Sequence, residues 1–154
     1  MNLTYPAILA MCRRHADRLN WSMQRLGPLL PLDEDKLKQL DDVTLAVLDQ
    51  FSLRFAKLQD AMGAKLFPAA LERMREPGEL VTFLDQLHRL EKVGAVASAD
   101  QWLLLREVRN AFAHDYPDDP AVPTAVLNRA LPMAQQLLDA LDTLERFIER
   151  FATE

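Results

Sequence analysis

Apolar residues recur at intervals of three and four along most of this chain, rather than at every second position. Such spacing places apolar side chains on one face of an α-helix, whereas strict alternation would indicate strands. The first segment with this pattern includes Ile8 and Leu19. It follows Thr4, a residue type that caps helix N-termini, and it stops before Gly27. The sequence therefore predicts a first helix that ends at about Leu26.

A second helical pattern begins around Asp35 and continues to about Met62. The segment from Gly63 to Pro68 interrupts it and leaves two possibilities open. Pro68 either lies in the first turn of a new helix or kinks a helix that continues.

Three more helical patterns follow, from about Leu80 to Gly94, from Ala99 to the residues before Pro117, and from Thr124 to about Phe151. Ser98 is a suitable N-cap for the middle one, and Pro132 predicts a kink in the last. No internal repeat or strand pattern is found. We therefore predict a single all-α domain over residues 1–154, an antiparallel bundle of about five to six helices.

Length and composition limit the setting of this domain. A chain of 154 residues buries a sufficient core without disulfides or metals. Its single cysteine, Cys12, cannot form an internal disulfide, which favours a reducing compartment. No apolar run has the length of a signal sequence or of a membrane span. The expected location is cytoplasmic, with no membrane partner.

Charge argues against a surface built for broad nucleic-acid binding. The formal net charge is -5, whereas that mode of binding relies on clustered Lys and Arg. Any contact with RNA is therefore expected to be local. His15 and His88 show no metal-ligand spacing, and His15 is expected on an exposed face of the first helix.

One short segment combines three chemically useful side chains, the sequence Arg-Asn-Ala-Phe-Ala-His-Asp-Tyr at residues 109–116. Arg109 can stabilise a phosphate, His114 can move a proton near neutral pH, and Tyr116 has a hydroxyl that can be modified. On a regular helix His114 lies about 140° from Arg109. The groups therefore converge only if the last turn unwinds or if two copies meet across a symmetric dimer.

Each of these residues also has an ordinary structural explanation. Arg109 lies on the same helix face as Trp102 and Phe112, where it would form a salt bridge with an inward-facing acid. His114 would be a cation at a helix C-terminus, and Tyr116 a packed aromatic residue. Only their combination favours a functional site.

The segment resembles the R-x4-H-x-Y signature of the HEPN superfamily, specifically of its HepT-like branch. In this chain the signature residues are Arg109, His114 and Tyr116, and a polar residue, Asn110, follows Arg109. The helix that contains residues 49–58 is also similar to the long second helix of that group. The resemblance implies the fold of a nucleotidyltransferase substrate-binding subunit. It also implies a partner protein, a minimal nucleotidyltransferase that is encoded beside this chain.

The resemblance further implies a ribonuclease toxin of a toxin-antitoxin pair, which acts as a homodimer and needs neither a metal nor another cofactor. His114, Arg109 and Asn110 would be catalytic, and the partner would neutralise the toxin by transferring AMP to Tyr116. Arg54 and Arg106 are candidate RNA-binding residues if their helices face each other. Arg106 lies one turn before Arg109, so the two could share a phosphate.

Two alternatives remain open at this point. In the first, the same residues form a non-catalytic surface that binds the nucleotidyltransferase, and no RNA is cut. In the second, the chain is a purely structural helical dimer. A resemblance in fold does not by itself establish activity.

Overall fold

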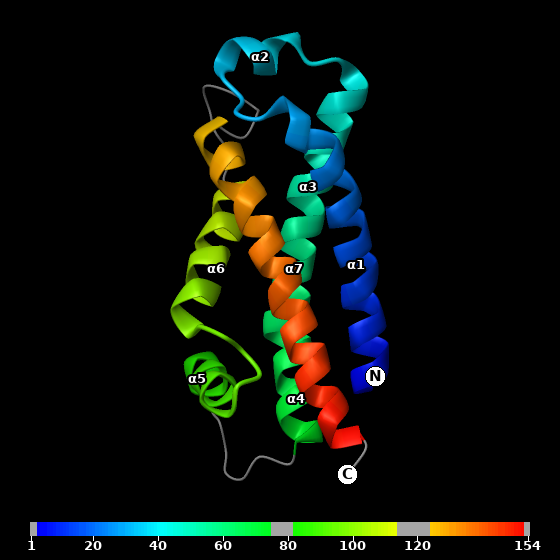
Figure 1. Cartoon of the computed structure of the whole chain (residues 1–154), viewed down its shortest axis with the longest axis vertical. Coiled ribbons are helices and arrows are strands. Elements are labelled where there is room, and N and C mark those ends of the chain that lie inside the picture. Colours follow the sequence, from blue (N-terminus) through cyan, green and yellow to red (C-terminus); the bar gives the residue numbers. More distant parts are fainter. Residues whose placement is uncertain (1–2, 75–81, 114–123, 153–154) are drawn as a thin grey trace.

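The computed structural model describes residues 3–74, 82–113 and 124–152, and all regular structure within these ranges is helical (Figure 1). The elements are α1 (Tyr5–Leu26), η1 (Gly27–Leu29), α2 (Glu34–Gln39), α3 (Asp42–Ala61), η2 (Met62–Leu66), α4 (Phe67–Arg73), α5 (Phe83–Val93), α6 (Ala99–Ala113) and α7 (Thr124–Ala152). The predicted all-α class is therefore confirmed.

Side-chain caps define most helix starts. Thr4 Oγ1 accepts a hydrogen bond from the Ala7 amide at the start of α1, and Thr82 Oγ1 accepts one from Asp85 at the start of α5. Such caps satisfy amides that have no partner within the helix. At the other end of α5, Gly94 has φ +93°, a conformation that favours glycine. The predicted end at Gly94 is confirmed, whereas Leu80 lies outside the described residues.

The expectation of one helix from about Asp35 to Met62 is wrong at its beginning. The chain instead forms the short α2, passes through Leu40 in an extended conformation (ψ 137°), and starts α3 afresh. Asp41 causes this restart, because its carboxylate accepts a hydrogen bond of 2.8 Å from the Thr44 amide.

At Gly63 the structure combines parts of both alternatives, because the helical path continues and Pro68 nevertheless lies in the first turn of a separate α-helix. A π-helical turn, η2, joins α3 to α4, and Pro68 lies in the first turn of α4. There its missing N–H group is tolerated. If α3, η2 and α4 are counted as one rod and the short η1 is left aside, the described residues form six helices, in agreement with the predicted bundle.

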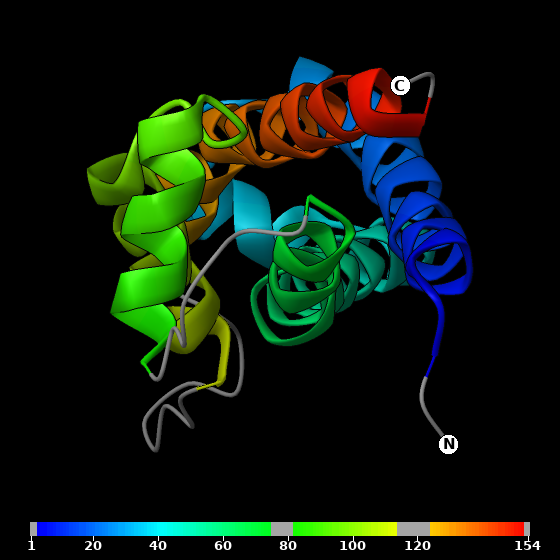
Figure 2. The ribbon, with the colours of Figure 1, turned by 90° about the horizontal axis from the view of Figure 1, so that it is seen from below.

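The helices are arranged around the rod formed by α3, η2 and α4. In Figures 1 and 2, α1 lies on one side of this rod, α6 on the other, and α7 covers a third side. α5 crosses below α6, and α2 closes the opposite end of the bundle. Between them lies one apolar core, in which the largest fully buried side chains include Trp102, Phe51, Phe55, Phe67, Leu19 and Leu58.

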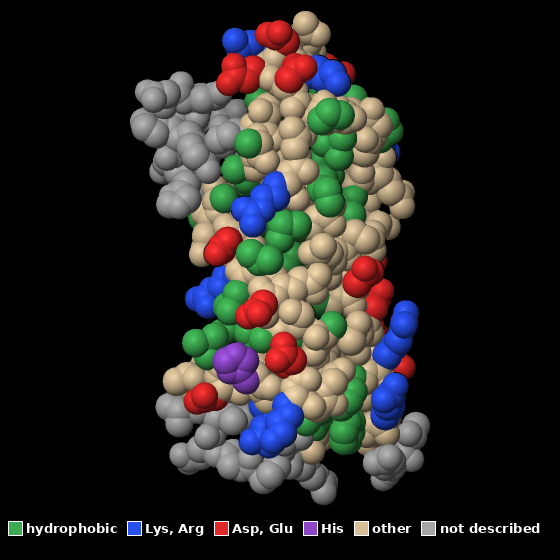
Figure 3. Space-filling model, turned by 60° about the vertical axis from the view of Figure 1, so that its left-hand side comes forward, with side chains coloured by type: hydrophobic (Ala, Val, Ile, Leu, Met, Phe, Trp, Pro, Cys, Tyr) green, Lys and Arg blue, Asp and Glu red, His purple; other side chains and the backbone are tan. Residues whose placement is uncertain are grey.

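Ion pairs connect α1 to α7. Arg13 forms ion pairs with Asp142 and Glu145 of α7. The face formed mainly by α5, α6 and α7 carries acidic and basic groups in alternation, and no basic stripe runs along its described part (Figure 3). None of the helices in the described ranges is both long enough and apolar enough to cross a membrane.

Candidate functional site

The C-terminal part of α6 carries Arg109 and Asn110, the two motif residues that the structure describes. Ser98 Oγ accepts a hydrogen bond of 3.1 Å from the Gln101 amide and so caps this helix, as predicted. His114 and Tyr116 follow the last described residue of α6 and lie outside the described residues.

Aromatic packing fixes the rotation of α6 about its own axis. The Phe112 ring meets Phe55 edge-on at 5.4 Å between centroids and meets Phe51 at 6.1 Å. Both partners belong to α3 and are fully buried. Because positions two apart on a helix differ by about 200°, Asn110 points away from this contact and is exposed.

Arg109 is held by a carboxylate of the neighbouring helix. Its Nε and Nη2 atoms each donate a hydrogen bond of 2.8 Å to Asp60, one to each carboxylate oxygen. Side-chain exposure is 28% for Arg109 and 49% for Asp60, so the pair contributes at most about 1 kcal/mol to stability. Its main effect is to orient the guanidinium group, which leaves Nη1 for another acceptor.

Arg106 lies on the same side of α6 as Arg109. Its guanidinium carbon is 5.4 Å from the centroid of the Phe83 ring. Together with Asp60 and Gly63 it lines an open pocket of about 550 Å³. The structure therefore brings Arg106, Arg109 and Asp60 to one edge between α3 and α6.

Arg54 is placed elsewhere. Its Nη1 atom lies 2.9 Å from His15 Nδ1 on α1, so its side chain faces α1 and not α6. His15 is accordingly half-buried rather than fully exposed, which differs from the sequence-based expectation. Although α3 and α6 do pack together, Arg54 belongs to a different surface from Arg106 and Arg109.

Burial is the main cause that lowers the pKa of His15, and the positive charges of Arg54, Lys57 and Arg14 lower it further. A neutral imidazole is also the form that can accept a hydrogen bond from Arg54.

Stability is therefore expected to fall as the pH is lowered through the range below about 6.5, where the unfolded chain protonates His15 more readily than the folded chain does. Above that range the contribution of neutral His15 to the free energy of unfolding is fully present.

Urea unfolding of the parent and of His15→Gln at pH 7.5 and pH 5.5 would measure this contribution. We expect a smaller loss in His15→Gln, and His88→Gln on the exposed face of α5 should behave as the parent. Equal losses in all three proteins would contradict the assignment.

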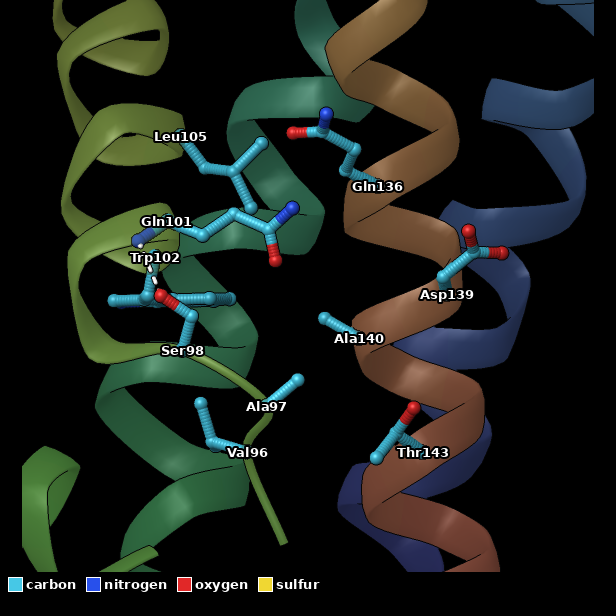
Figure 4. A pocket seen from close by; sticks show the side chains of 10 residues that line it. All are labelled: Val96, Ala97, Ser98, Gln101, Trp102, Leu105, Gln136, Asp139, Ala140 and Thr143. Atoms are coloured by element: carbon cyan, nitrogen blue, oxygen red, sulfur yellow. Dashed lines mark hydrogen bonds between the residues drawn. The ribbon is translucent and has the colours of Figure 1, made fainter. Parts of the chain in front are cut away.

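A second pocket, of about 190 Å³, lies between α6 and α7 (Figure 4). Gln101 and Trp102 line it from α6, and Gln136 and Asp139 line it from α7. The indole Nε1 of Trp102 is buried and has no hydrogen-bond partner in the described structure. Of the described residues that line this pocket, only Asp139 is charged, so these residues provide no acid-base pair. The described residues contain no group of three His, Cys, Asp or Glu side chains that could hold a metal ion.

Sequence reasoning did not identify Asp60. It lies 49 positions from Arg109, and no periodic signal connects the two residues. Only the packing of α3 against α6 makes the contact visible.

No family model, curated protein or solved structure was found to match this chain. The described residues thus define an all-helical bundle with a cluster of arginines at the edge between α3 and α6.

Proposed function

We propose that the chain is a metal-independent ribonuclease of the HepT-like type, the toxin of a toxin-antitoxin pair, and that it acts as a homodimer. The observation that carries this proposal is the R-x4-H-x-Y sequence, whose arginine, Arg109, lies on α6, is partly exposed and is oriented by Asp60. Arg106, one turn earlier, adds a second cation on the same side.

The chemistry assigned to these residues is the transfer of an RNA phosphodiester to its neighbouring ribose 2′-oxygen. The 2′-oxygen forms a new bond to phosphorus, and the bond from phosphorus to the 5′-oxygen breaks. His114 takes the proton from the 2′-hydroxyl or supplies one to the leaving oxygen. Arg109 stabilises the negative charge that develops on the phosphorane, and Asn110 helps to hold the phosphate or the imidazole.

Tyr116 is the proposed site of control. A partner nucleotidyltransferase would transfer AMP to its hydroxyl and release pyrophosphate. Because Tyr116 is two positions from His114, the added phosphate and base would occupy the place of the RNA. The described residues contribute no phosphate-binding loop of their own to this reaction, which fits a chain that is modified by a partner.

Asp60 is proposed to act as a positioning residue for Arg109. Asp60→Asn should lower kcat about tenfold, a change of about 1.4 kcal/mol, and leave KM within about twofold. The reason is that a neutral amide cannot accept both charge-assisted hydrogen bonds and so holds the guanidinium less firmly. Single-turnover and steady-state cleavage would measure both constants.

The control for this prediction is Glu107→Gln, since Glu107 is an exposed acid on α6 that lies 3.9 Å from Arg129. It should keep parental values of kcat and KM. An Asp60→Asn protein that cuts as fast as the parent, or faster, would show that Asp60 does not position Arg109.

The experiment that tests the proposed function uses paired substrates of one sequence. The purified chain should cut the RNA and leave a 2′,3′-cyclic phosphate and a 5′-hydroxyl end. It should leave the fully 2′-O-methylated strand intact, because that strand has no free nucleophile. Equal cutting of both strands would exclude attack by the 2′-oxygen. Binding of a nucleotidyltransferase without any cutting of RNA would instead support a non-catalytic binding subunit.

A further inference from the structure

A groove of about 400 Å³ runs between α1 and the N-terminal half of α3, and its lining combines cations with an exposed aromatic ring. Among the described residues that line this groove, none is acidic. The residues that shape it are Arg18 and Trp21 of α1, and Val43, Val47, Gln50 and Arg54 of α3. α1 and α3 lie side by side along the bundle in both ribbon views (Figures 1 and 2).

The two α1 residues that line the groove, Arg18 and Trp21, belong to a longer stripe on that helix. Arg14, Arg18, Trp21 and Arg25 follow each other at intervals of four, three and four, so they share one face of the helix. From Arg14 to Arg25 the stripe is about 16 Å long at the helical rise per residue. At about 3.4 Å per stacked nucleotide, that length accommodates about five nucleotides of a single strand.

One acid lies close to these arginines on their own helix, Asp17, which is exposed one position before Arg18. Within the described part of the chain, Arg18 and Arg25 form no ion pair with a carboxylate. The Nε atom of Arg54 is buried and has no hydrogen-bond partner. Lys57 lies one turn beyond Arg54, and Asp42 and Asp49 are on the neighbouring face of α3 rather than in the groove.

The groove also contains an exposed aromatic side chain, that of Trp21. Trp21 is 38% exposed, and the Arg25 guanidinium carbon lies 4.4 Å from the centroid of its ring. Val43, on the opposite wall, is 73% exposed. A planar base can stack on Trp21 while its phosphates contact the arginines, and this pairing of stacking with cations is the usual mode of single-strand recognition. Double-stranded RNA hides the faces of its bases from such a ring.

We propose that the groove between α1 and α3 binds a single-stranded segment of the RNA substrate, with a base on Trp21 and phosphates on Arg18 and Arg54 in the groove and on Arg25 beside it. The choice of RNA as the ligand rests on the proposed ribonuclease function. It extends that function, because it assigns recognition of the strand to a surface other than the one that contains Arg109.

The geometry of α3 connects the groove to Arg109. Arg54 faces the groove, and Asp60 holds Arg109 on the other side of the same rod. Six positions on a helix correspond to about 120° of rotation and about 9 Å of rise. Lys57 is exposed between these two positions. A strand that leaves the groove can therefore cross the outer face of α3 and reach Arg109.

The test measures binding of a dye-labelled, unstructured RNA of about 12 nucleotides by fluorescence anisotropy at several salt concentrations. All proteins are full-length and carry His114→Ala, so that the RNA stays intact. We expect Arg18→Gln with Arg25→Gln to weaken binding about tenfold at low salt. The slope of log affinity against log salt should fall by about 1.4, because two phosphate contacts are lost.

The control double variant is Arg129→Gln with Arg146→Gln, which removes two exposed arginines of α7 and makes the same change in net charge. Its affinity and salt slope should match those of the His114→Ala parent. Equal effects from the two double variants would show that only net charge matters and would overturn the proposal.

Stacking is tested separately. RNA should quench the fluorescence of Trp21, and Trp21→Leu should abolish that quenching and weaken binding about fivefold to a hundredfold. The other tryptophan, Trp102, is buried and provides an unchanged background signal. An unaltered affinity in Trp21→Leu would overturn the assignment of the stacking site.

The outcomes separate this inference from the proposed nuclease function. If the chain with His114 intact does not cut RNA but the groove variants lose RNA binding, the nuclease proposal fails and the groove stands. If the chain with His114 intact cuts RNA, but the groove variants bind RNA as tightly as the α7 double variant does, the groove proposal fails and the nuclease proposal stands. If the groove variants keep RNA affinity but change the sedimentation coefficient, a second copy of the chain occupies the groove, which also overturns the proposal.

Discussion

Replacing His114 with alanine is expected to slow cleavage of RNA by about two to four orders of magnitude, because proton transfer by a positioned side chain contributes about that much. Arg109→Ala is expected to slow cleavage by about two to three orders of magnitude, since it removes a cation aimed at the charge that develops on phosphorus. Single-turnover cleavage of a labelled RNA at saturating protein concentration would measure both effects on the chemical step.

Two further variants make this prediction specific. Arg109→Lys keeps the charge but lacks the planar guanidinium that donates from two nitrogens to Asp60, so it should recover only part of the lost rate. Arg146→Gln, on the exposed face of α7, should cut as the parent does. Parental cleavage rates in His114→Ala or Arg109→Ala would contradict the assigned roles.

Phe55→Ala is expected to lower the free energy of unfolding by about 3–5 kcal/mol. Phe55 is fully buried, and its ring contacts Phe51 of the same helix and Phe112 of α6. Alanine would leave a cavity directly beneath the end of α6 that carries Arg109. Urea unfolding followed by circular dichroism would give the change.

Leu53→Ala is the matched control for Phe55→Ala, because it lies on the same helix two positions away and is 48% exposed. Its free energy of unfolding should change by no more than about 0.5 kcal/mol. If Phe55→Ala lowered the free energy of unfolding by less than about 1 kcal/mol, the aromatic contact would not hold α6 firmly against α3.

Local signals in the sequence were sufficient for most of the fold. The ends of α1 and α5 follow from Thr4, Gly27 and Gly94, because capping depends on residues close in the sequence. The start of a separate helix after Asp41 was not predicted from the sequence. Apolar residues continue in helical spacing on both sides of Leu40, so periodicity alone did not reveal that a side-chain cap would begin a new helix there.

The candidate site was predictable only in part. The placement of Arg109 and Asn110 near the end of α6 agrees with the sequence, whereas His114 and Tyr116 lie outside the described residues. The contact with Asp60 depends on how two distant helices pack, and no pattern within either helix encodes it. The same holds for Arg54, which pairs with His15 of α1. The sequence predicted that any contact with RNA is local, but it did not show that Arg18 of α1 and Arg54 of α3 line one groove.

The most direct test of the account is cleavage of a labelled RNA by the purified chain in the presence of a chelator. Intact mass must first establish that Tyr116 carries no AMP, and Arg109→Ala and His114→Ala are prepared identically. We expect the unmodified parent to cut RNA and neither variant to do so at a comparable rate. No cutting of varied RNAs by the parent, or equal cutting by all three proteins, would contradict the claim that this helical bundle is a metal-independent ribonuclease.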